Sequence, residues 1–276
     1  MAVTTDALEE LVLAALSEDV GRGDLTTEAT VDQDVVGTAE LLVREPGVAF
    51  GLQVARAVFR ALDPETRFEA LVEEGACVEG PTTVARVSGP LRAILTGERV
   101  ALNLLGRLSG VATLTRRYVS AVEGTGVSIL DTRKTTPGLR RLEKEAVVAG
   151  GGRNHRFGLF DGVLIKDNHL RATGSIAAAV ERARTASDLP VEVECDTLAQ
   201  VIEALEAGAD AILLDNMPLD DLRAAVELVA GRARLEASGG VTLDNVRAVA
   251  ETGVDEISIG ALTHSARSLD VSLELR

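Results

Sequence analysis

Aromatic side chains are scarce in this 276-residue chain: they make up 2% of the sequence, and tryptophan is absent. Hydrophobic residues still reach 46%, so the core must be built from Ala, Val, Leu and Ile, a composition typical of α/β proteins. Few aromatics also means few platforms on which nucleic-acid bases can stack. A formal net charge of −15 argues further against a nucleic-acid partner, because binding to phosphate backbones requires a basic face.

Cysteine is equally scarce. Cys77 and Cys195 stand far apart and have no metal-type spacing, so we expect reduced, buried thiols. No apolar run approaches the roughly 20 residues that span a bilayer. The acidic N-terminal segment does not resemble a secretory signal. These features predict a soluble, cytoplasmic protein with no membrane partner.

Lysine occurs only at Lys134, Lys144 and Lys166, whereas arginine occurs 25 times. All three lysines fall within residues 131–171, where nine Lys and Arg stand against five Asp and Glu, a net charge of +4. A positive segment in an acidic protein suits a small anion that carries several charges. We expect Lys144 to lie on a solvated helix face. Lys134 and Lys166 are better candidates for function, because a compact ammonium is retained there in a chain that otherwise uses Arg.

The N-terminal third has the pattern of a small α+β domain with a mostly antiparallel sheet. Helices are expected at residues 6–19 and 52–61, and short strands at 35–43, 68–72, 76–79, 84–87 and 91–95. A long helix should follow, capped by Thr96. Gly106 and Gly110 weaken that helix and suggest the close approach of another backbone, for instance that of a second subunit. Arg99 in its first turn opposes the helix dipole, which leaves room for a role in ligand binding.

From residue 127 onward the pattern changes to apolar runs that alternate with helices. Such runs predict parallel strands covered on both faces. They are VSILD at 127–131, GVLIK at 162–166, VEVEC at 191–195, AILLD at 211–215, RLEAS at 234–238 and EISIG at 256–260. A full βα barrel has eight strands. A short further strand is expected near 153–157, which would make an incomplete, seven-stranded TIM-like barrel.

Charged residues and glycine turns stand at the ends of these runs, where the active sites of such barrels lie. The set comprises Arg133, Lys134, Lys166, Glu194, Asp215, Ser238, Gly239, Gly240 and Gly260. Glycine turns that precede helices suit a phosphate monoester. Glu194 and Asp215 are candidate ligands for Mg²⁺, through water.

Planar cationic forks and imidazole donors are suited to carboxylates. Arg133, His155, Arg156 and also Arg99 therefore form a candidate carboxylate-binding set. The alternative is a metal site formed by His155, Asp167 and His169, although no metal-type spacing supports it.

Long segments of the chain resemble the quinolinate phosphoribosyltransferase family. The resemblance rests on DTRKTTPG at 131–138, GGGRNHRFGLFDGVLIKDNHL at 150–170, and on VEVECDT, ILLDNM, LEASGGV and GVDEISIGALTHSA. EDVGRGDLTT and ERVALNLLGRLSGVAT fit the same family. The resemblance covers essentially the whole chain, and the motif positions show no departure from it.

The resemblance implies an N-terminal α+β sandwich domain at 1–108, to which 266–276 return, and an incomplete βα barrel at 109–265. It implies a homodimer, sometimes assembled into a higher homo-oligomer, in which Arg99 enters the neighbouring active site. The implied reaction joins quinolinate to 5-phosphoribosyl-1-pyrophosphate (PRPP) with Mg²⁺, giving nicotinate mononucleotide, pyrophosphate and CO₂ in NAD biosynthesis.

The family roles carry over residue by residue. Quinolinate would be held by Arg99, Arg133, His155 and Arg156. Lys134 and Lys166 would face the pyrophosphate and the reacting centre, and Glu194 and Asp215 would serve the ribose and Mg²⁺. The 5′-phosphate would lie against Ser238, Gly239, Gly240 and Gly260.

Three other functions fit parts of the pattern. A molybdenum-transport-associated paralogue would use the same scaffold for another substrate. An aldolase or decarboxylase barrel would form a Schiff base, with Lys166 as the candidate amine. A binding protein without turnover would not need both Glu194 and Asp215 close to an anion.

Overall fold

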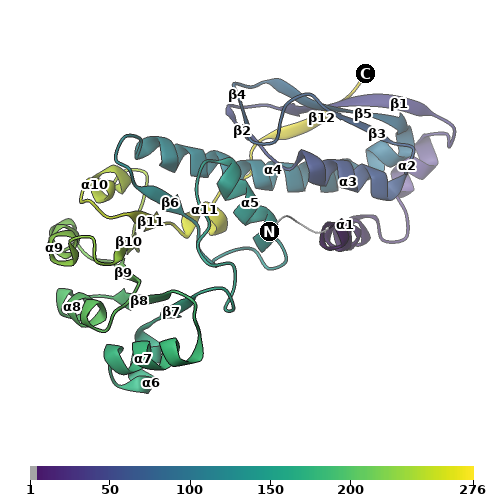
Figure 1. The fold of residues 1–276 in the computed structure, drawn as a ribbon. Coiled ribbons are helices and arrows are strands. Elements are labelled where there is room, and N and C mark those ends of the chain that lie inside the picture. Colours follow the sequence, from purple (N-terminus) through teal and green to yellow (C-terminus); the bar gives the residue numbers. More distant parts are fainter. Residues whose placement is uncertain (1–4) are drawn as a thin grey trace. The chain divides into compact units, whose positions relative to one another are not determined.

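A computed structural model describes residues 5–276 of the chain (Figure 1). The chain divides into two compact units. The first contains the residues up to 116 together with 136–151 and 265–276, and the second contains 117–135 and 152–264. The units thus divide the chain differently from the predicted domains, because 136–151 group with the first unit.

The first unit is built on antiparallel sheets and helices. Its elements are α1 (Thr5–Val20), α2 (Leu25–Thr30), β1 (Val36–Val43), β2 (Gly47–Ala49), α3 (Leu52–Leu62), β3 (Arg67–Ala70), β4 (Ala76–Val78), β5 (Thr82–Pro90), α4 (Leu91–Ala121, which continues into the second unit), α5 (Arg140–Ala149) and β12 (Val271–Leu275). Four strands form one sheet in the order β12-β1-β5-β3, and β2 pairs with β4. The last strand, β12, pairs antiparallel with β1.

The predicted strand at 91–95 is wrong, because α4 already begins at Leu91. The preceding strand β5 ends at Pro90, and Leu91 donates its backbone N–H to Val35 O at 2.9 Å. Ile94 is fully buried in the core of this unit. A short apolar run fits a buried strand and a buried helix equally well, so periodicity alone could not decide between them. The short helix α2, begun by the Asp24 side chain, was also missed.

Two glycines in α4 allow another part of the chain to approach its backbone. A Cβ atom at Gly110 would lie 2.0 Å from Arg267 O, and one at Gly106 would lie 2.9 Å from Leu269 O. The close approach predicted from these glycines is confirmed. The neighbour is the chain's own C-terminal segment, so no second subunit is needed to explain them.

The second unit is a parallel sheet with helices between successive strands. Its elements are β6 (Ser128–Leu130), β7 (Val163–Ile165), α6 (Asp167–Thr173), α7 (Ile176–Ala186), β8 (Val191–Cys195), α8 (Leu198–Glu206), β9 (Ala211–Asp215), α9 (Leu219–Val229), β10 (Arg234–Ser238), α10 (Val246–Ala250), β11 (Glu256–Ser258) and α11 (Ala261–His264). The six strands lie in the order β6-β11-β10-β9-β8-β7. Figure 1 shows α7, α8, α9 and α10 on the outer side of this curved sheet.

All six predicted parallel strands are present. The strand expected near 153–157 is reduced to one parallel bridge, between Leu130 and Arg153. The chain turns away after that bridge because His155 N–H donates to the buried carboxylate of Asp131 at 2.9 Å rather than to a neighbouring strand. The barrel is therefore incomplete, as expected.

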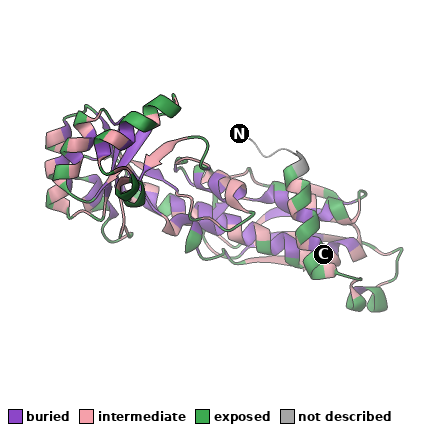
Figure 2. Cartoon of the chain, turned by 90° about the horizontal axis from the view of Figure 1, so that it is seen from below, coloured by how far each residue is buried: buried purple, intermediate pink, exposed green. Residues whose placement is uncertain are grey.

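Burial follows the amphipathic pattern of the helices. Figure 2 shows buried residues along the strands and the inner faces of the helices, and exposed residues outside. Two expectations fail here. Lys144 is 2% exposed rather than solvated, and Cys77 is exposed, whereas Cys195 is buried. Within the described residues, no helix is long and apolar enough to cross a membrane.

Replacement of Gly110 by Ala tests the close approach to α4. Alanine favours helix by about 1 kcal/mol over glycine, yet its methyl group would meet the Arg267 backbone, which cannot move aside as a side chain can. We expect Gly110→Ala to destabilise the protein by about 1–3 kcal/mol, measured by urea unfolding. Gly162→Ala is the control, because its Cβ meets nothing closer than 3.5 Å. A stabilised Gly110→Ala protein would contradict the contact.

Candidate functional site

The parallel register of the second unit brings polar residues together at one edge of its sheet. Ser238 pairs with Asp215 on one side and with Ser258 on the other. The carboxyl ends of these strands open onto a cavity of about 670 Å³. It is lined by Thr132, Arg133, Lys134, His155, Arg156, Leu164, Lys166, Glu194, Leu213, Asp215, Asn216, Glu236, Ser238, Gly239, Gly240, Val241, Thr242, Ser258, Ile259, Gly260, Ala261 and His264. Every predicted site residue except Arg99 is among them.

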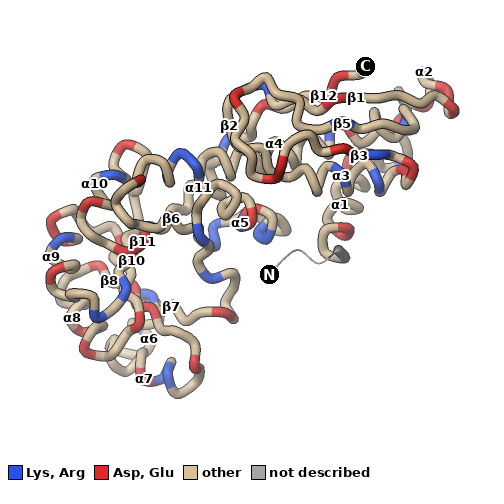
Figure 3. Tube along the Cα trace, turned by 45° about the horizontal axis from the view of Figure 1, so that its top comes forward, with Lys and Arg blue, Asp and Glu red and all other residues tan. Residues whose placement is uncertain are grey.

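Two guanidinium groups lie close together in this cavity. Burial and the nearby charge of Arg133 lower the pKa of Arg156. Its guanidinium donates to Gly162 O at 3.2 Å, and the loop between them is closed by Asp161, which accepts from the backbone N–H groups of Phe157 and Gly158. Figure 3 shows basic residues along the segments that follow β6 and precede β7. Such a pair favours an anion, since a bound negative charge relieves the repulsion between the cations.

The turn after β10 has the backbone of a phosphate cradle. Gly239 and Gly240 follow one another with φ angles of 89° and 62°. Asn245 stabilises the turn, as its Nδ2 donates to Gly240 O at 3.0 Å. Asn216 covers Gly239 so closely that a Cβ there would lie 2.3 Å from Asn216 Oδ1. Successive left-handed glycines present their N–H groups to one side, which suits a phosphate.

A further glycine, Gly260, follows β11 at the same end of the sheet. A Cβ at Gly260 would lie 2.9 Å from Lys134 Cδ and 3.2 Å from His264 Nε2. Thr263 Oγ1 donates to Lys134 O at 2.8 Å, which fixes the segment that carries the lysine. His264 was missed by the sequence analysis. Its position in the short helix α11 that follows Gly260 was the available signal.

Acidic side chains face the cavity from neighbouring strands. Glu194 forms an ion pair with Lys166, and Asp215 accepts from Asn216 Nδ2 at 2.8 Å. Two carboxylates beside a phosphate cradle provide the hard oxygen donors that Mg²⁺ prefers to share with phosphate oxygens and water. This donor set therefore fits the predicted Mg²⁺.

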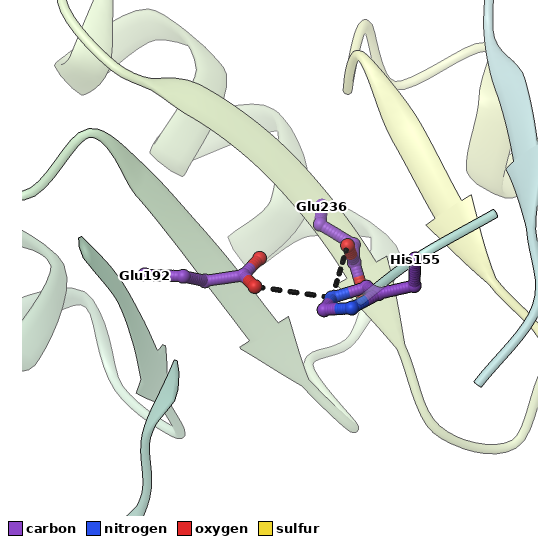
Figure 4. A group of neighbouring side chains, drawn as sticks. All are labelled: His155, Glu192 and Glu236. Carbon is purple, nitrogen blue, oxygen red and sulfur yellow. Dashed lines mark ion pairs between the residues drawn. The ribbon is translucent and has the colours of Figure 1, made fainter. Parts of the chain in front are cut away.

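One imidazole and two carboxylates, those of His155, Glu192 and Glu236, form a largely buried group (Figure 4). His155 Nε2 is 3.0 Å from Glu192 Oε2 and 3.3 Å from Glu236 Oε2. Burial alone would lower the pKa of His155, but the hydrogen bonds to Glu192 and Glu236 outweigh it and raise this pKa to about 10. Burial raises the pKa of Glu236 as well.

The backbone N–H of Arg156 donates to His155 Nδ1 at 2.7 Å. An Nδ1 that accepts from this N–H leaves the ring proton on Nε2, toward the carboxylates. The raised pKa of His155 means that the group keeps a proton at pH values where an isolated histidine has lost it.

The alternative metal site is not formed. Within residues 5–276, the one group of three or more candidate metal ligands is His155, Glu192 and Glu236. His169 Nδ1 instead accepts from the Lys166 backbone at 2.9 Å, and Asp167 accepts from the N–H of Asn168. Glu192 and Glu236 were missed in the sequence. Their signal was an acid two residues before each strand-end residue, on the same face of the strand.

Family models match both parts of the chain. The model described as "Quinolinate phosphoribosyl transferase, C-terminal domain" matches residues 111–274, and the corresponding N-terminal domain matches residues 24–109. The chain belongs to the quinolinate phosphoribosyltransferase family. The predicted resemblance is thereby confirmed.

Curated relatives and solved structures agree with this family. The chain is 44% identical to the "Probable nicotinate-nucleotide pyrophosphorylase [carboxylating]" of Bacillus subtilis, over 97% of this chain and 93% of that protein. It is 45% identical to the Mycobacterium leprae nicotinate-nucleotide pyrophosphorylase [carboxylating], over 98% of each chain. The crystal structure of NadC from Streptococcus pyogenes superposes with a TM-score of 0.96 at 41% identity, covering 100% of this chain and 99% of that one.

The raised pKa of His155 predicts how stability depends on pH. A group whose pKa is higher in the folded state stabilises that state fully below its unfolded pKa of 6.5, and the contribution declines as pH rises through the folded value of about 10. We expect the difference in unfolding free energy between wild type and His155→Gln to shrink as pH increases from 6.5 toward 10. Urea unfolding over this range measures it. A difference that stays constant with pH would contradict the assignment.

Proposed function

We propose that this protein transfers the phosphoribosyl group of PRPP to the ring nitrogen of quinolinate. The products are nicotinate mononucleotide, pyrophosphate and CO₂. The observation that carries the proposal is that a pair of guanidinium groups and a phosphate cradle line one cavity. A dicarboxylate and a phosphorylated sugar can therefore bind side by side.

The cationic end of the cavity suits the acceptor. Arg133 and Arg156 would bind the two carboxylates of quinolinate, and His155 lies beside them. Guanidinium groups form two parallel hydrogen bonds with a carboxylate, so they fix the plane of the ring as well as its position. A clamped ring presents its nitrogen in line with the sugar carbon, and such orientation supplies much of the rate acceleration in bimolecular reactions.

The donor would bind at the glycine turns. The N–H groups of the Gly239–Gly240 turn and of Gly260 would hold the 5′-phosphate, and Ser238 lies beside them. Lys134 and Lys166 would stabilise the charge that grows on the departing pyrophosphate. Glu194 and Asp215 would face the ribose, whose anomeric carbon becomes cationic. Glu194 and Asp215 would also hold Mg²⁺, which would further neutralise the charge of the leaving group.

Decarboxylation follows from the product of the first step. Once its nitrogen is ribosylated, the pyridine ring carries a positive charge next to one carboxylate. Loss of CO₂ leaves an electron pair on the adjacent ring carbon, and the cationic nitrogen stabilises it until a proton is taken up. No prosthetic group is required. Lys166 is bonded as an ammonium to Glu194, so it is poorly placed to act as a Schiff-base amine.

A homodimer completes the proposal. Arg99 lies in the first unit, its side chain is 63% exposed, and it does not line the cavity. We propose that Arg99 of one subunit enters the cavity of its neighbour and adds a third guanidinium to the acceptor end. We propose that the protein acts in the cytoplasm. The proposed reaction requires no membrane partner.

A coupled assay tests the reaction itself. Purified protein with PRPP, Mg²⁺ and quinolinate is expected to form nicotinate mononucleotide and CO₂ in equal amounts, whereas nicotinate should not be a substrate because it lacks the second carboxylate. Loss of activity with EDTA, and its return with Mg²⁺, tests the metal. Turnover of nicotinate at the same rate, or of neither acid by folded protein, would favour the paralogous function.

Substitution of Gly239 tests the phosphate cradle. An added Cβ would collide with Asn216 at a φ angle that side chains avoid, so Gly239→Ala should raise the KM for PRPP by about tenfold or more. Gly208→Ala is the matched control, with a φ of 80° and nothing within 4 Å of the new Cβ. It carries similar backbone strain away from the cavity. Equal KM values for PRPP in the two variants would refute the cradle.

A further inference from the structure

Glu192 and Glu236 occupy buried positions, where apolar residues would make the fold more stable. They are 7% and 1% exposed, and one oxygen of each, Oε1, has no hydrogen-bond partner in the structure. Burying two carboxylates side by side costs free energy that well-packed hydrophobic residues would not. Retention of both acids points to a role in function.

The strand alternation places this acidic pair two residues before the polar residues at the strand ends. Side chains two residues apart point to the same face of a strand, so Glu192 lies below Glu194 on β8, and Glu236 lies below Ser238 on β10. The upper members, Glu194 and Ser238, line the cavity, and so does Glu236, whereas Glu192 does not. The lower members converge on His155 Nε2 from two strands that are not neighbours, with β9 between them (Figure 4).

His155 connects the acidic pair to the acceptor end. Its ring is held at Nε2 by the two acids, and its backbone N–H by Asp131. Its Nδ1 accepts from the N–H of Arg156. Arg156 therefore follows directly on His155, a residue that is fixed at three points. The charge of Glu192 also attracts the Arg156 guanidinium.

Glu236 has a second connection, toward the phosphate cradle. Glu236 itself lines the cavity, unlike Glu192, and it stands two residues before Ser238 on β10. The Oγ atoms of Ser258 and Ser238 are 3.0 Å apart, and Ser238 begins the glycine turn. Glu236 thus reaches the cavity on the strand that leads into the phosphate cradle, whereas Glu192 contacts His155 at the acceptor end.

We propose that Glu192 and Glu236 are positioning residues with unequal reach. Glu192 orients His155 and Arg156 for the acceptor dicarboxylate. Glu236 does the same and also lines the cavity on the strand that carries Ser238 and the phosphate cradle, so it aligns the acceptor with the donor. This inference rests on the proposed function, because it assigns the two ends of the cavity to quinolinate and PRPP.

The test compares Glu192→Gln with Glu236→Gln in the full-length protein. Each change keeps the shape of the side chain and removes its charge. We expect Glu192→Gln to raise the KM for quinolinate about tenfold, as for the loss of one charge-assisted hydrogen bond, with the KM for PRPP and kcat unchanged within about twofold. Glu236→Gln should raise both KM values. Glu206→Gln is the control, an exposed acid on α8.

A purely structural role would give a different result. The yield of active protein would then fall in both variants with neither KM changed. Alternatively, the two variants would show the same changes in the KM for quinolinate and the KM for PRPP. Either result overturns the proposal. If a glutamine variant does not fold, His155→Asn changes the common partner, and it should reproduce the selective loss of quinolinate binding. An unchanged quinolinate KM in that variant also overturns the proposal.

Two further measurements separate this inference from its premises. Calorimetric binding of quinolinate and of PRPP to wild type needs no turnover, so a protein that binds both without reacting refutes the proposed function alone. A wild type that does not bind quinolinate overturns both. Stoichiometric transition metal in wild type, lost in Glu192→Gln, would identify the acidic pair and His155 as a metal site and overturn the positioning role.

Discussion

The parallel register of the six-stranded sheet is the constraint on which the site depends. Because the strands run in one direction, residues far apart in the sequence end at the same edge, and Asp215, Ser238 and Ser258 lie side by side. The strands themselves are almost wholly apolar, so the hydrophobic effect sets the register. A shift by one residue would send every functional side chain to the other face.

Two residues before the strand ends the sheet carries a second set of polar side chains. The two sets have different roles. The set at the strand ends meets ligands, while the second set, Glu192 and Glu236, holds the groups that meet them. A buried polar network of this kind makes its surroundings rigid and holds the side chains around it in one arrangement. The incomplete closure of the barrel makes this possible, since the segment carrying His155 follows a single bridge and is fixed by side chains rather than by a ladder.

The parallel sheet and most residues of the cavity could be predicted from the sequence. Strand ends such as Lys166 and Glu194 stand out because apolar runs rarely end in charge, and the six runs give the parallel sheet directly. The second set was missed because Glu192 and Glu236 lie inside the runs, where an acid appears only as an interruption. The prediction of a strand at 91–95 failed because a five-residue, mostly apolar segment has no distinguishing period. The neighbour of Gly110 could not be predicted, since nothing local indicates which backbone will approach.

The pairing of β12 with β1 makes the first unit discontinuous in the chain. Its N-terminal strands leave the ribosome early, yet one edge of their sheet and the segment that packs on Gly110 are synthesised only after the whole second unit. Closing a loop of that length is slow compared with local folding. The second unit, whose contacts are mostly between successive strands, can therefore form first during synthesis. The order of the chain thus favours assembly of the catalytic sheet before the first unit is complete.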